Sequence, residues 1–241
     1  MIESPSHENI VHNSLLLDLP PKEREFMFPK LEFVQLETRY VLQEAGDILK
    51  SAYFLDSGLV SILSVFPDGK SVEVGLVGKE GFVGLPLIAG FRTASTRAIA
   101  PIAGTAYRVD GKTLMAILPR CPTLERRLQQ FSQIMMLQSR QIGGCYGFHQ
   151  VPERLARWLL MSTDRIGSNS VPLTHEFFAT ILGTRRSSVT QASGTLEKAG
   201  LIARSRANIR IVDRQKLEKA ACECYGIMQT RVKAWLGDAE K

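Results

Sequence analysis

Apolar and polar residues alternate over short stretches between residues 31 and 109. Val72, Val74 and Leu76, for example, occupy every second position of one such stretch. This period of two predicts β-strands with one buried face. Pro67-Asp68-Gly69, between two of the stretches, is typical of a hairpin turn. Short, evenly spaced strands predict a small antiparallel roll and not a parallel sheet of β-α-β units.

A long helix is predicted to follow this region. Asp110 is expected to cap a short helix that runs to Leu118, and Pro122 to open a helix that ends near Gly143. Six positions in the long helix are separated by alternating steps of four and three, as in a coiled coil. They are Leu124, Leu128, Phe131, Met135, Gln138 and Ile142.

This row of side chains has two interpretations: a seam between two copies of the chain, or a helix packed on its own β domain. We expect the seam, with the six side chains shared between two symmetric copies of the chain. The segment 143–152, which is rich in glycine, is expected to be a hinge.

Residues 174–200 predict two short helices joined by a tight turn. Thr174 is expected to cap the first helix, and Gly183 to end it in a conformation with positive φ. Thr184 is then expected to cap the second helix. Its inner face would be formed by Val189, Ala192 or Ser193, and Leu196. This arrangement is typical of a helix-turn-helix.

The outward face of the second helix and the segment behind it suggest DNA binding. Arginine can hold guanine with two hydrogen bonds, and Gln, Ser and Thr can contact other base edges or phosphates. Residues 201–212 predict two strands around a basic tip, a wing suited to phosphate contact. The residues expected to contact DNA are Thr184, Arg185, Arg186, Ser187, Ser188, Thr190, Gln191, Arg204, Arg206 and Arg210.

The charge distribution agrees with this interpretation. The 241-residue chain has a formal net charge of +6, and all of the excess lies after residue 150. The N-terminus lacks the pattern of a signal peptide, and no 18-residue apolar run is present. The four cysteines do not form a disulfide pattern. We therefore expect a cytoplasmic protein.

Taken together, the order of these elements resembles the Crp/Fnr family of bacterial transcription regulators. The motifs that carry the resemblance are Ser57-Gly58, residues 152–156 (PERLA) and residues 183–189 (GTRRSSV). The resemblance implies an α+β fold with an antiparallel β-roll of the double-stranded β-helix type that is like a cyclic nucleotide-binding domain. A long dimerisation helix and a C-terminal winged helix-turn-helix would follow.

The implied domains are residues 1–118, a β-roll sensor; 119–150, the dimerisation helix and hinge; and 151–241, the DNA-binding domain. In the family the recognition helix commonly offers an Arg, then a Glu, then a polar or basic residue four positions later. The matching residues here are Arg186, Ser187 and Gln191. Because Ser replaces Glu, the usual acidic contact to cytosine is missing.

The resemblance also implies a position for an effector pocket. Family members that bind cyclic nucleotides use a Gly-Glu turn for the ribose and a following Arg for the phosphate. Here Leu85 or Phe82 stands at the Glu position, so no carboxylate is available. The candidate pocket residues are Phe82, Gly84, Leu85, Arg92, Thr93 and Arg97. We expect a degenerate sensor that binds no cyclic nucleotide, and no other cofactor is predicted.

Cysteine and histidine positions give little support for a metal site. Cys145 and His149 have i,i+4 spacing, but two ligands make a poor site. Cys222 and Cys224 are expected on one helix, where residues two apart diverge by about 200°. No metal is therefore predicted. No catalytic motif is present either, and the sequence does not predict an enzyme.

The sequence therefore predicts a homodimeric regulator that reads a palindromic site in the major groove, with double-stranded DNA and RNA polymerase as partners. The alternative is a ligand-, redox- or metal-sensing module that acts on a protein partner. The effector, the operator, the direction of regulation and the roles of Cys145, Cys222 and Cys224 do not follow from the sequence.

Overall fold

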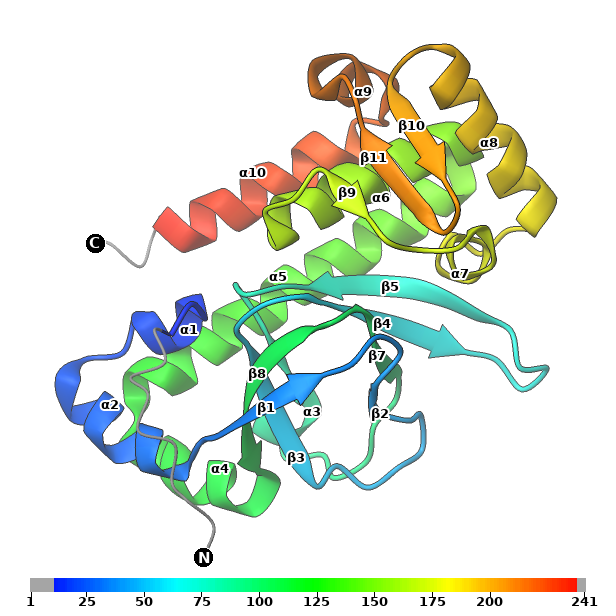
Figure 1. The fold of residues 1–241 in the computed structure, drawn as a ribbon. Helices are drawn as coiled ribbons and strands as arrows, with labels where there is room; N and C mark the ends of the chain where they lie inside the picture. Colours follow the sequence, from blue (N-terminus) through cyan, green and yellow to red (C-terminus); the bar gives the residue numbers. More distant parts are fainter. Residues whose placement is uncertain (1–10, 238–241) are drawn as a thin grey trace, which may run out of the picture.

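The computed structural model describes residues 11–237. The outer ends of the two predicted terminal domains, residues 1–10 and 238–241, lie outside the described residues. A β-roll and a mainly helical C-terminal unit lie one above the other, and a long helix passes along both (Figure 1). The α+β architecture with an antiparallel roll is as predicted.

The roll is built from two four-stranded antiparallel sheets, with strand orders β1-β8-β3-β6 and β2-β7-β4-β5. Phe54 and Phe82, one from each of two paired strands, pack with ring centroids 4.8 Å apart in its core. The strands are β1 (Glu32–Leu36), β2 (Val41–Gln43), β3 (Ser51–Leu55), β4 (Leu59–Val65), β5 (Ser71–Val77), β6 (Phe82–Val83), β7 (Arg97–Ile102) and β8 (Gly104–Asp110).

The predicted hairpin joins β4 to β5. Gly69 has φ +80°, a left-handed conformation that glycine adopts without steric cost. The carboxylate of Asp68 accepts a hydrogen bond from the backbone N–H of Lys70 and pairs with its ammonium group at 2.7 Å. These local contacts explain why the turn could be predicted from three residues.

Short helices close the ends of the roll. Asn13 caps the first of them, and its side-chain amide donates to the carbonyl oxygens of Leu55 (2.7 Å) and Gly81 (2.9 Å), which ties the N-terminal segment to the sheets. Asp110 caps α4 as predicted. These helices are α1 (Ser14–Leu17), α2 (Pro21–Met27), η1 (Phe28–Lys30), α3 (Leu85–Ile88), α4 (Gly111–Ile117) and η2 (Leu118–Arg120).

The long helix α5 (Pro122–Phe148) corrects two predictions. It does not end near Gly143, because its glycines remain helical. The predicted seam is also not available to a second copy of the chain. Leu124, Leu128, Phe131, Gln138 and Ile142 are buried within a single chain, and Met135 is partly buried against the same core. The alternative interpretation, a helix packed on its own β domain, is the right one for this face.

Gln138 shows why a polar residue is tolerated in that buried row. Its Oε1 accepts a hydrogen bond from the backbone N–H of Leu76, and its Nε2 donates to the carbonyl oxygen of the same residue at 3.3 Å. Leu76 lies in β5, the edge strand of its sheet. The amide of Gln138 therefore satisfies backbone groups that have no neighbouring strand.

The C-terminal unit begins with α6 (Val151–Ile166) and ends with a helix that returns to α5. Its three-stranded antiparallel sheet has the order β10-β11-β9. The remaining elements are β9 (Ser170–Val171), α7 (His175–Ile181), α8 (Arg186–Lys198), β10 (Ile202–Ser205), β11 (Asn208–Ile211), α9 (Arg214–Ala220) and α10 (Cys224–Gly237).

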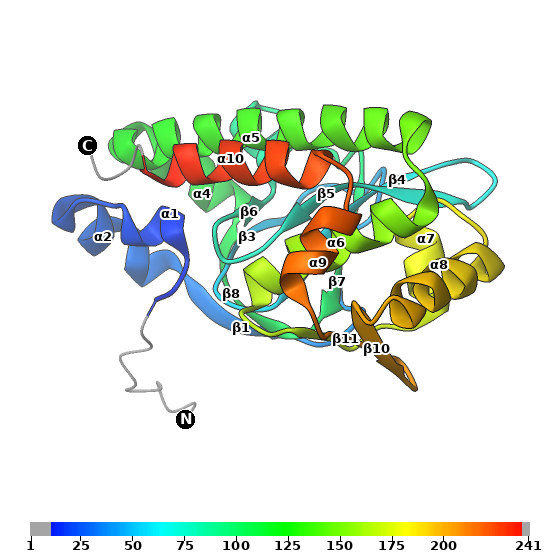
Figure 2. The ribbon, with the colours of Figure 1, turned by 90° about the horizontal axis from the view of Figure 1, so that it is seen from above.

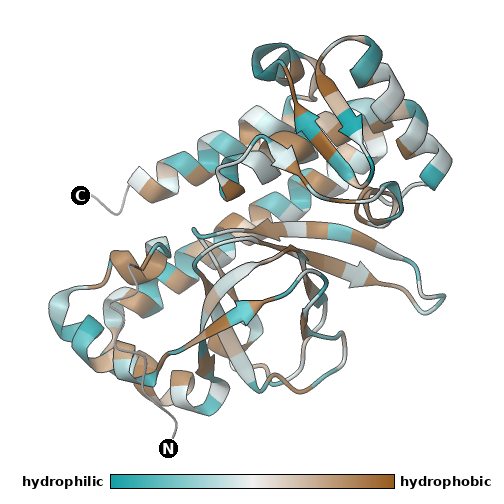
Figure 3. Cartoon of the chain, in the orientation of Figure 1, coloured by the Kyte–Doolittle hydropathy of each residue, from teal (hydrophilic) through white to brown (hydrophobic). Residues whose placement is uncertain are grey.

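The last helix, α10, lies alongside α5 in both views (Figures 1 and 2). Trp235 of α10 packs on Phe131 with ring centroids 5.5 Å apart, and the guanidinium of Arg127 lies 4.6 Å from the Trp235 ring centroid. Hydrophobic and hydrophilic residues alternate along α5 and α10 (Figure 3), as expected of helices with buried and exposed sides.

The two hydrophobic cores cross the predicted domain boundaries. Trp235 belongs to the core of the roll, whereas Leu59, Leu63 and Leu76 of the roll belong to the core of the C-terminal unit. The roll and the C-terminal unit are therefore packed against each other through apolar side chains.

Buried polar contacts reinforce this junction. The carboxylate of Glu73 in β5 accepts hydrogen bonds from the Ser61 hydroxyl at 2.6 Å and from the indole N–H of Trp158, in α6, at 2.9 Å. Arg165 of α6 pairs with Glu80 at 2.7 Å. Glu73 is fully buried, and this burial raises its pKa to about 7, although both hydrogen bonds act in the opposite direction.

Glu73→Gln should change the pH dependence of stability. With a pKa raised from 4.5 to about 7, ionised Glu73 opposes folding. The stabilisation present below pH 4.5 is therefore lost as pH rises through 7, by about 3 kcal/mol at most. Glutamine keeps an acceptor for Trp158 but does not ionise. Urea unfolding should show the variant gaining stability relative to the wild type between pH 5 and pH 8.

The matched control is Glu37→Gln, which changes an exposed glutamate and should follow the wild-type curve. If Glu73→Gln also ran parallel to the wild type across this pH range, the carboxyl group would not be titrating there.

Candidate nucleic-acid interface

The helix-turn-helix is formed by α7 and α8. The hydroxyl of Thr174 caps α7 by accepting a hydrogen bond from the N–H of Phe177 at 3.3 Å. Gly183 follows with φ +55°, and a Cβ built there would lie 2.8 Å from Cγ2 of Val72 in the roll. Both the turn conformation and this close approach therefore require glycine, as the sequence predicted for the turn.

The predicted cap of the second helix is wrong by one residue. The backbone N–H of Thr184 bonds to the carbonyl oxygen of Ala179 at 3.0 Å, which keeps Thr184 within the turn. Arg185 is the N-cap of α8, and no side chain caps that end of the helix.

The two faces of α8 are as predicted. Its inner side packs on α6 and α7, and both Ala192 and Ser193 are buried there with Val189 and Leu196. Ser188 and Thr184 are half-buried beside the β4–β5 hairpin. The exposed face consists of Arg185, Arg186, Ser187, Thr190 and Gln191.

Contacts on this face differ in how far they restrict its side chains. Arg186 lies 3.9 Å from the carboxylate of Glu176, but both are more than 70% exposed, so the pair contributes little and leaves the guanidinium mobile. The Thr190 hydroxyl is close to the Arg186 carbonyl oxygen and to Nδ1 of His175, each at 3.1 Å. The Thr190 hydroxyl therefore already has hydrogen-bond partners within the protein.

His175 of α7 contacts α8 through both of its ring nitrogens. Its Nε2 lies 3.4 Å from the Ser193 hydroxyl, opposite the contact with Thr190. Burial, and then the charges of Arg204 and Arg186, lower the pKa of His175, so the imidazole is neutral near pH 7. No partner for this histidine could be inferred from sequence patterns, because its contacts lie 15 and 18 residues away.

The wing is formed by β10 and β11, with Arg206 and Ala207 at the turn. Ala207 has φ +55°, an uncommon conformation for a residue with a Cβ. Arg206 and Arg210 are exposed, as the prediction of phosphate contact requires. Strand β9, which completes the sheet, was not predicted; the hydroxyl of its Ser170 donates to the side chain of Asn208 at 2.9 Å.

Arg204, which the sequence predicts to contact phosphate, has partners within the fold. Its Nε donates to the carboxylate of Glu197 in α8 at 2.7 Å, and its Nη1 donates to the Ser193 hydroxyl at 3.2 Å. The same carboxylate accepts the backbone N–H of Arg204 at 3.0 Å. Arg204 therefore joins the wing to the inner side of the recognition helix.

The predicted effector residues occupy different environments. Phe82 is in the core of the roll, and Gly84 (φ +122°) precedes α3, which begins at the half-buried Leu85. Arg92 and Thr93 are exposed in a loop. Arg97 pairs with Glu44 at 2.7 Å. Phe82 is therefore closed to a ligand, and the guanidinium of Arg97 already has a carboxylate partner.

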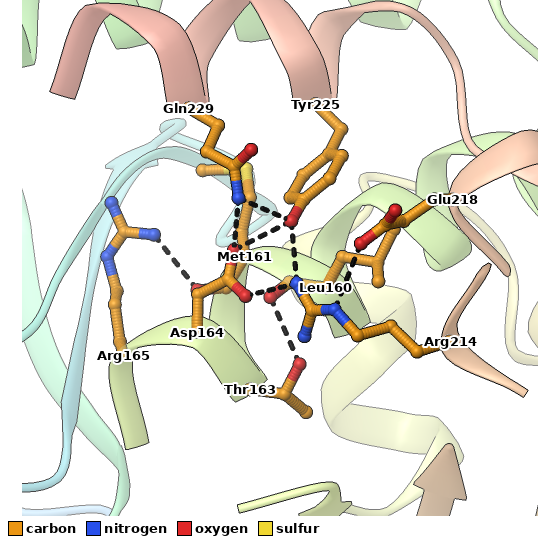
Figure 4. A network of polar contacts seen from close by, with 9 residues as sticks. All are labelled: Leu160, Met161, Thr163, Asp164, Arg165, Arg214, Glu218, Tyr225 and Gln229. Atoms are coloured by element: carbon orange, nitrogen blue, oxygen red, sulfur yellow. Dashed lines mark hydrogen bonds and ion pairs between the residues drawn. The ribbon is translucent and has the colours of Figure 1, made fainter. Parts of the chain in front are cut away.

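A polar network that the sequence did not reveal joins α6, α9 and α10 (Figure 4). Asp164 accepts a hydrogen bond from the Tyr225 hydroxyl at 2.9 Å and pairs with Arg214. Arg214 also pairs with Glu218 at 2.9 Å, and Gln229 donates to the Tyr225 hydroxyl at 2.7 Å. These contacts hold the last two helices on α6, behind the helix-turn-helix.

Two family models match the chain in the order that the structure displays. The cyclic nucleotide-binding domain matches residues 33–121, and the Crp-like helix-turn-helix domain matches residues 153–220. The chain belongs to the Crp/Fnr family of transcription regulators.

Curated relatives of this Crp/Fnr chain are also regulators. It is 26% identical over 200 residues to the transcriptional regulator LdrP of Thermus thermophilus, covering 78% of this chain and 95% of LdrP. It is 26% identical over 207 residues to the nitrogen fixation regulation protein FixK of Bradyrhizobium diazoefficiens, covering 83% of this chain and 85% of FixK.

Among solved structures, a putative Crp/Fnr regulator from Eubacterium rectale has the same fold. The TM-score is 0.69 at 16% identity, with 87% of this chain and 98% of that chain covered. As in its relatives, the helix-turn-helix marks this Crp/Fnr chain as a DNA-binding regulator. Within residues 11–237, every helix is too short or too polar to cross a membrane.

Glu197→Ala separates the two possible roles of Arg204 in this Crp/Fnr protein. If Arg204 positions the wing, losing Glu197 should lower affinity for a specific site several-fold, because the charge-assisted hydrogen bonds that hold the wing on α8 are removed. If Arg204 binds phosphate, the same change frees its guanidinium and should tighten binding. Fluorescence anisotropy with labelled duplex distinguishes the two.

Proposed function

We propose that this chain is a homodimeric regulator that reads a palindromic DNA site with α8 in the major groove and the wing on the flanking backbone. The observation that carries the proposal is the exposed face of α8, which presents Arg186, Ser187 and Gln191 beside the basic wing turn. Arg186 lies in the first turn of α8, the part of a recognition helix that contacts base edges.

A third side of α5, which is exposed, is the proposed dimer interface. The roll covers one side of this helix and α10 covers another. The uncovered side carries two partly exposed apolar residues, Met136 (36%) and Leu137 (42%). In Figure 2, α5 forms an outer edge of the molecule, with α10 along its inner side.

The residues around this apolar pair are suited to close packing of two helices. Gln129, Gln133 and Arg140 are exposed on the same side, and Gly143 and Gly147 follow one turn apart. A Cβ built at either glycine would meet nothing within 4 Å, so the surface there is open. Two copies related by a two-fold axis would place two recognition helices on one duplex.

The sensor is proposed to work without a cyclic nucleotide. The residue that begins α3, Leu85, has no carboxylate for a ribose hydroxyl, and Phe82 is part of the core. Arg97 is already paired with Glu44. We propose that the roll serves regulation through its buried contacts with the DNA-binding unit, and that the protein acts by binding and not by catalysis.

Selection of bound sequences from a random DNA pool by the purified protein tests this function, with and without added cAMP and cGMP. An enriched sequence with two-fold symmetry, equally enriched in all three conditions, supports the proposal. Enrichment that requires a nucleotide would contradict the proposed sensor, and no enrichment at low salt would contradict sequence-specific binding.

Arg186→Ala and Arg206→Ala should weaken DNA binding in different ways. Loss of Arg186 should cost about 1–3 kcal/mol and relax the preference at one base pair in each half-site. Loss of Arg206 should weaken all sequences alike and reduce the salt slope by about one for each phosphate that the guanidinium neutralises. The measurement is a salt titration of both variants on the selected site and on point-mutated sites. If Arg186→Ala still discriminated fully between bases, another element of the protein would have to read them.

Leu137→Asp should produce monomers. Burying an unpaired carboxylate between two helices costs about 3 kcal/mol or more, which raises the dimer dissociation constant by more than about 100-fold. Leu17→Asp is the matched control, because Leu17 is an exposed leucine (46%) in α1, away from the proposed interface. Sedimentation should show monomers only for Leu137→Asp. A dimeric Leu137→Asp protein would place the interface elsewhere.

A further inference from the structure

Three cysteines and a histidine meet where α5 ends and α10 begins. Cys145 and His149 are contributed by the end of α5, and Cys222 and Cys224 by the junction of α9 and α10. Their four potential ligand atoms all lie within 4.8 Å of one another. The cysteines are buried, and the His149 side chain is 16% exposed.

The backbone at the α9–α10 junction makes this convergence possible and corrects the prediction from the sequence. The sequence predicts Cys222 and Cys224 on one helix, with diverging side chains. Instead α9 ends at Ala220, Ala221 is extended (φ −75°, ψ 152°), and α10 begins at Cys224. Both thiols can therefore face the end of α5, where the i,i+4 spacing of Cys145 and His149 puts those two side chains on one side.

The distances fit four-coordinate binding of one cation. Sγ of Cys145 and Sγ of Cys222 are 3.5 Å apart, and Sγ of Cys224 is 3.6 Å from Nδ1 of His149. Ligands at ~2.0–2.3 Å from a tetrahedral zinc ion lie roughly 3.3–3.8 Å from one another. Small side-chain adjustments would thus bring the four atoms to bonding distance.

Neighbouring side chains support the ligands from outside. The other ring nitrogen of His149, Nε2, faces the carboxylate of Glu223 at 3.1 Å, the arrangement by which metal-binding histidines are commonly oriented. Gln141 donates a hydrogen bond to Sγ of Cys224 at 3.1 Å. With Nε2 held by Glu223, Nδ1 of His149 is directed at the thiols as the ligand atom.

The charge around the cluster also suits a bound cation held by thiolates. Arg157 of α6 is fully buried, and its Nε and Nη2 have no hydrogen-bond partner among the described residues. It is close enough to Cys145 and Cys222 for its charge to act on both thiols. Three thiolates and a divalent cation carry one net negative charge, which would compensate this buried guanidinium.

We propose that Cys145, His149, Cys222 and Cys224 form a binding site for a soft divalent cation of the zinc class. Four protein ligands leave no position for water or substrate, so the site is structural or sensory and not catalytic. On binding, the three thiols release their protons to solvent, so affinity should rise with pH.

Because of the position of the site, a bound cation would link two parts of the chain. It would join the end of α5, which carries the proposed dimer face, to the segment between α9 and α10. Cys145 and Cys222 are 77 residues apart, and His149 and Cys224 are 75 apart, so the cation would cross-link two distant segments at the junction of the units. Metal binding should therefore restrict how the DNA-binding unit moves relative to α5.

Cobalt titration of the reduced, metal-free full-length protein tests the proposal. One Co²⁺ per chain should bind, with the visible bands of tetrahedral cobalt and a thiolate-to-cobalt charge-transfer band, and Zn²⁺ should displace it. Cys222→Ser and Cys224→Ser should each bind Co²⁺ more weakly and lose about one third of the charge-transfer intensity, because each removes one of the three thiolates. Glu223→Gln leaves all four ligands in place and should lower affinity by about 10- to 100-fold.

Cys121→Ser is the matched control, since Cys121 is a buried cysteine outside the cluster, and its cobalt spectrum should equal that of the wild type. Circular dichroism separates a ligand effect from a folding defect, and Glu223→Gln gives a graded result if a cysteine variant fails to fold. Absence of the cobalt spectrum in reduced wild-type protein would overturn the proposal. So would a Cys145–Cys222 disulfide in a protein that binds no metal after reduction, which would make the cluster a redox pair.

Discussion

The packing of one side of α5 against the edge of the roll is the contact on which the other arrangements depend. Apolar side chains of α5 belong to the core of the roll, and Gln138 satisfies the backbone of the edge strand β5. Because that side is used within the chain, α10 can cover only a second side. A third side, which carries Met136 and Leu137, stays exposed. The end of the helix then lies beside both β5 and α6, so one rigid element positions both units.

Features that depend on neighbouring residues could be predicted from the sequence. The Thr174 cap and the positive φ of Gly183 follow from local backbone chemistry, and the β4–β5 turn follows from three residues. The buried row on α5 was also recognised, but its partner was not. A repeat of four and three marks a buried side of a helix without specifying whether the covering surface belongs to the same chain.

Features that depend on distant residues could not be predicted. Arg204 looked like a free cation in a basic segment, and only the fold shows the Glu197 carboxylate beside it. The cluster of Cys145 and Cys222 brings together residues 77 apart. The extended backbone at Ala221 decides whether neighbouring thiols converge, and the sequence of that segment reads as continuous helix. Long-range pairing and short irregular segments are thus where sequence patterns carry least information.

The chain has two tryptophans, and each lies at a different junction. Trp158 hydrogen-bonds to Glu73 between the roll and α6, whereas Trp235 packs on Phe131 between α10 and α5. The protein therefore carries two intrinsic fluorophores at the contacts that any movement between its units would disturb. If the other tryptophan is replaced by phenylalanine, emission from Trp158 would report separation of the units and emission from Trp235 would report release of the last helix, so each motion can be followed optically without an added label.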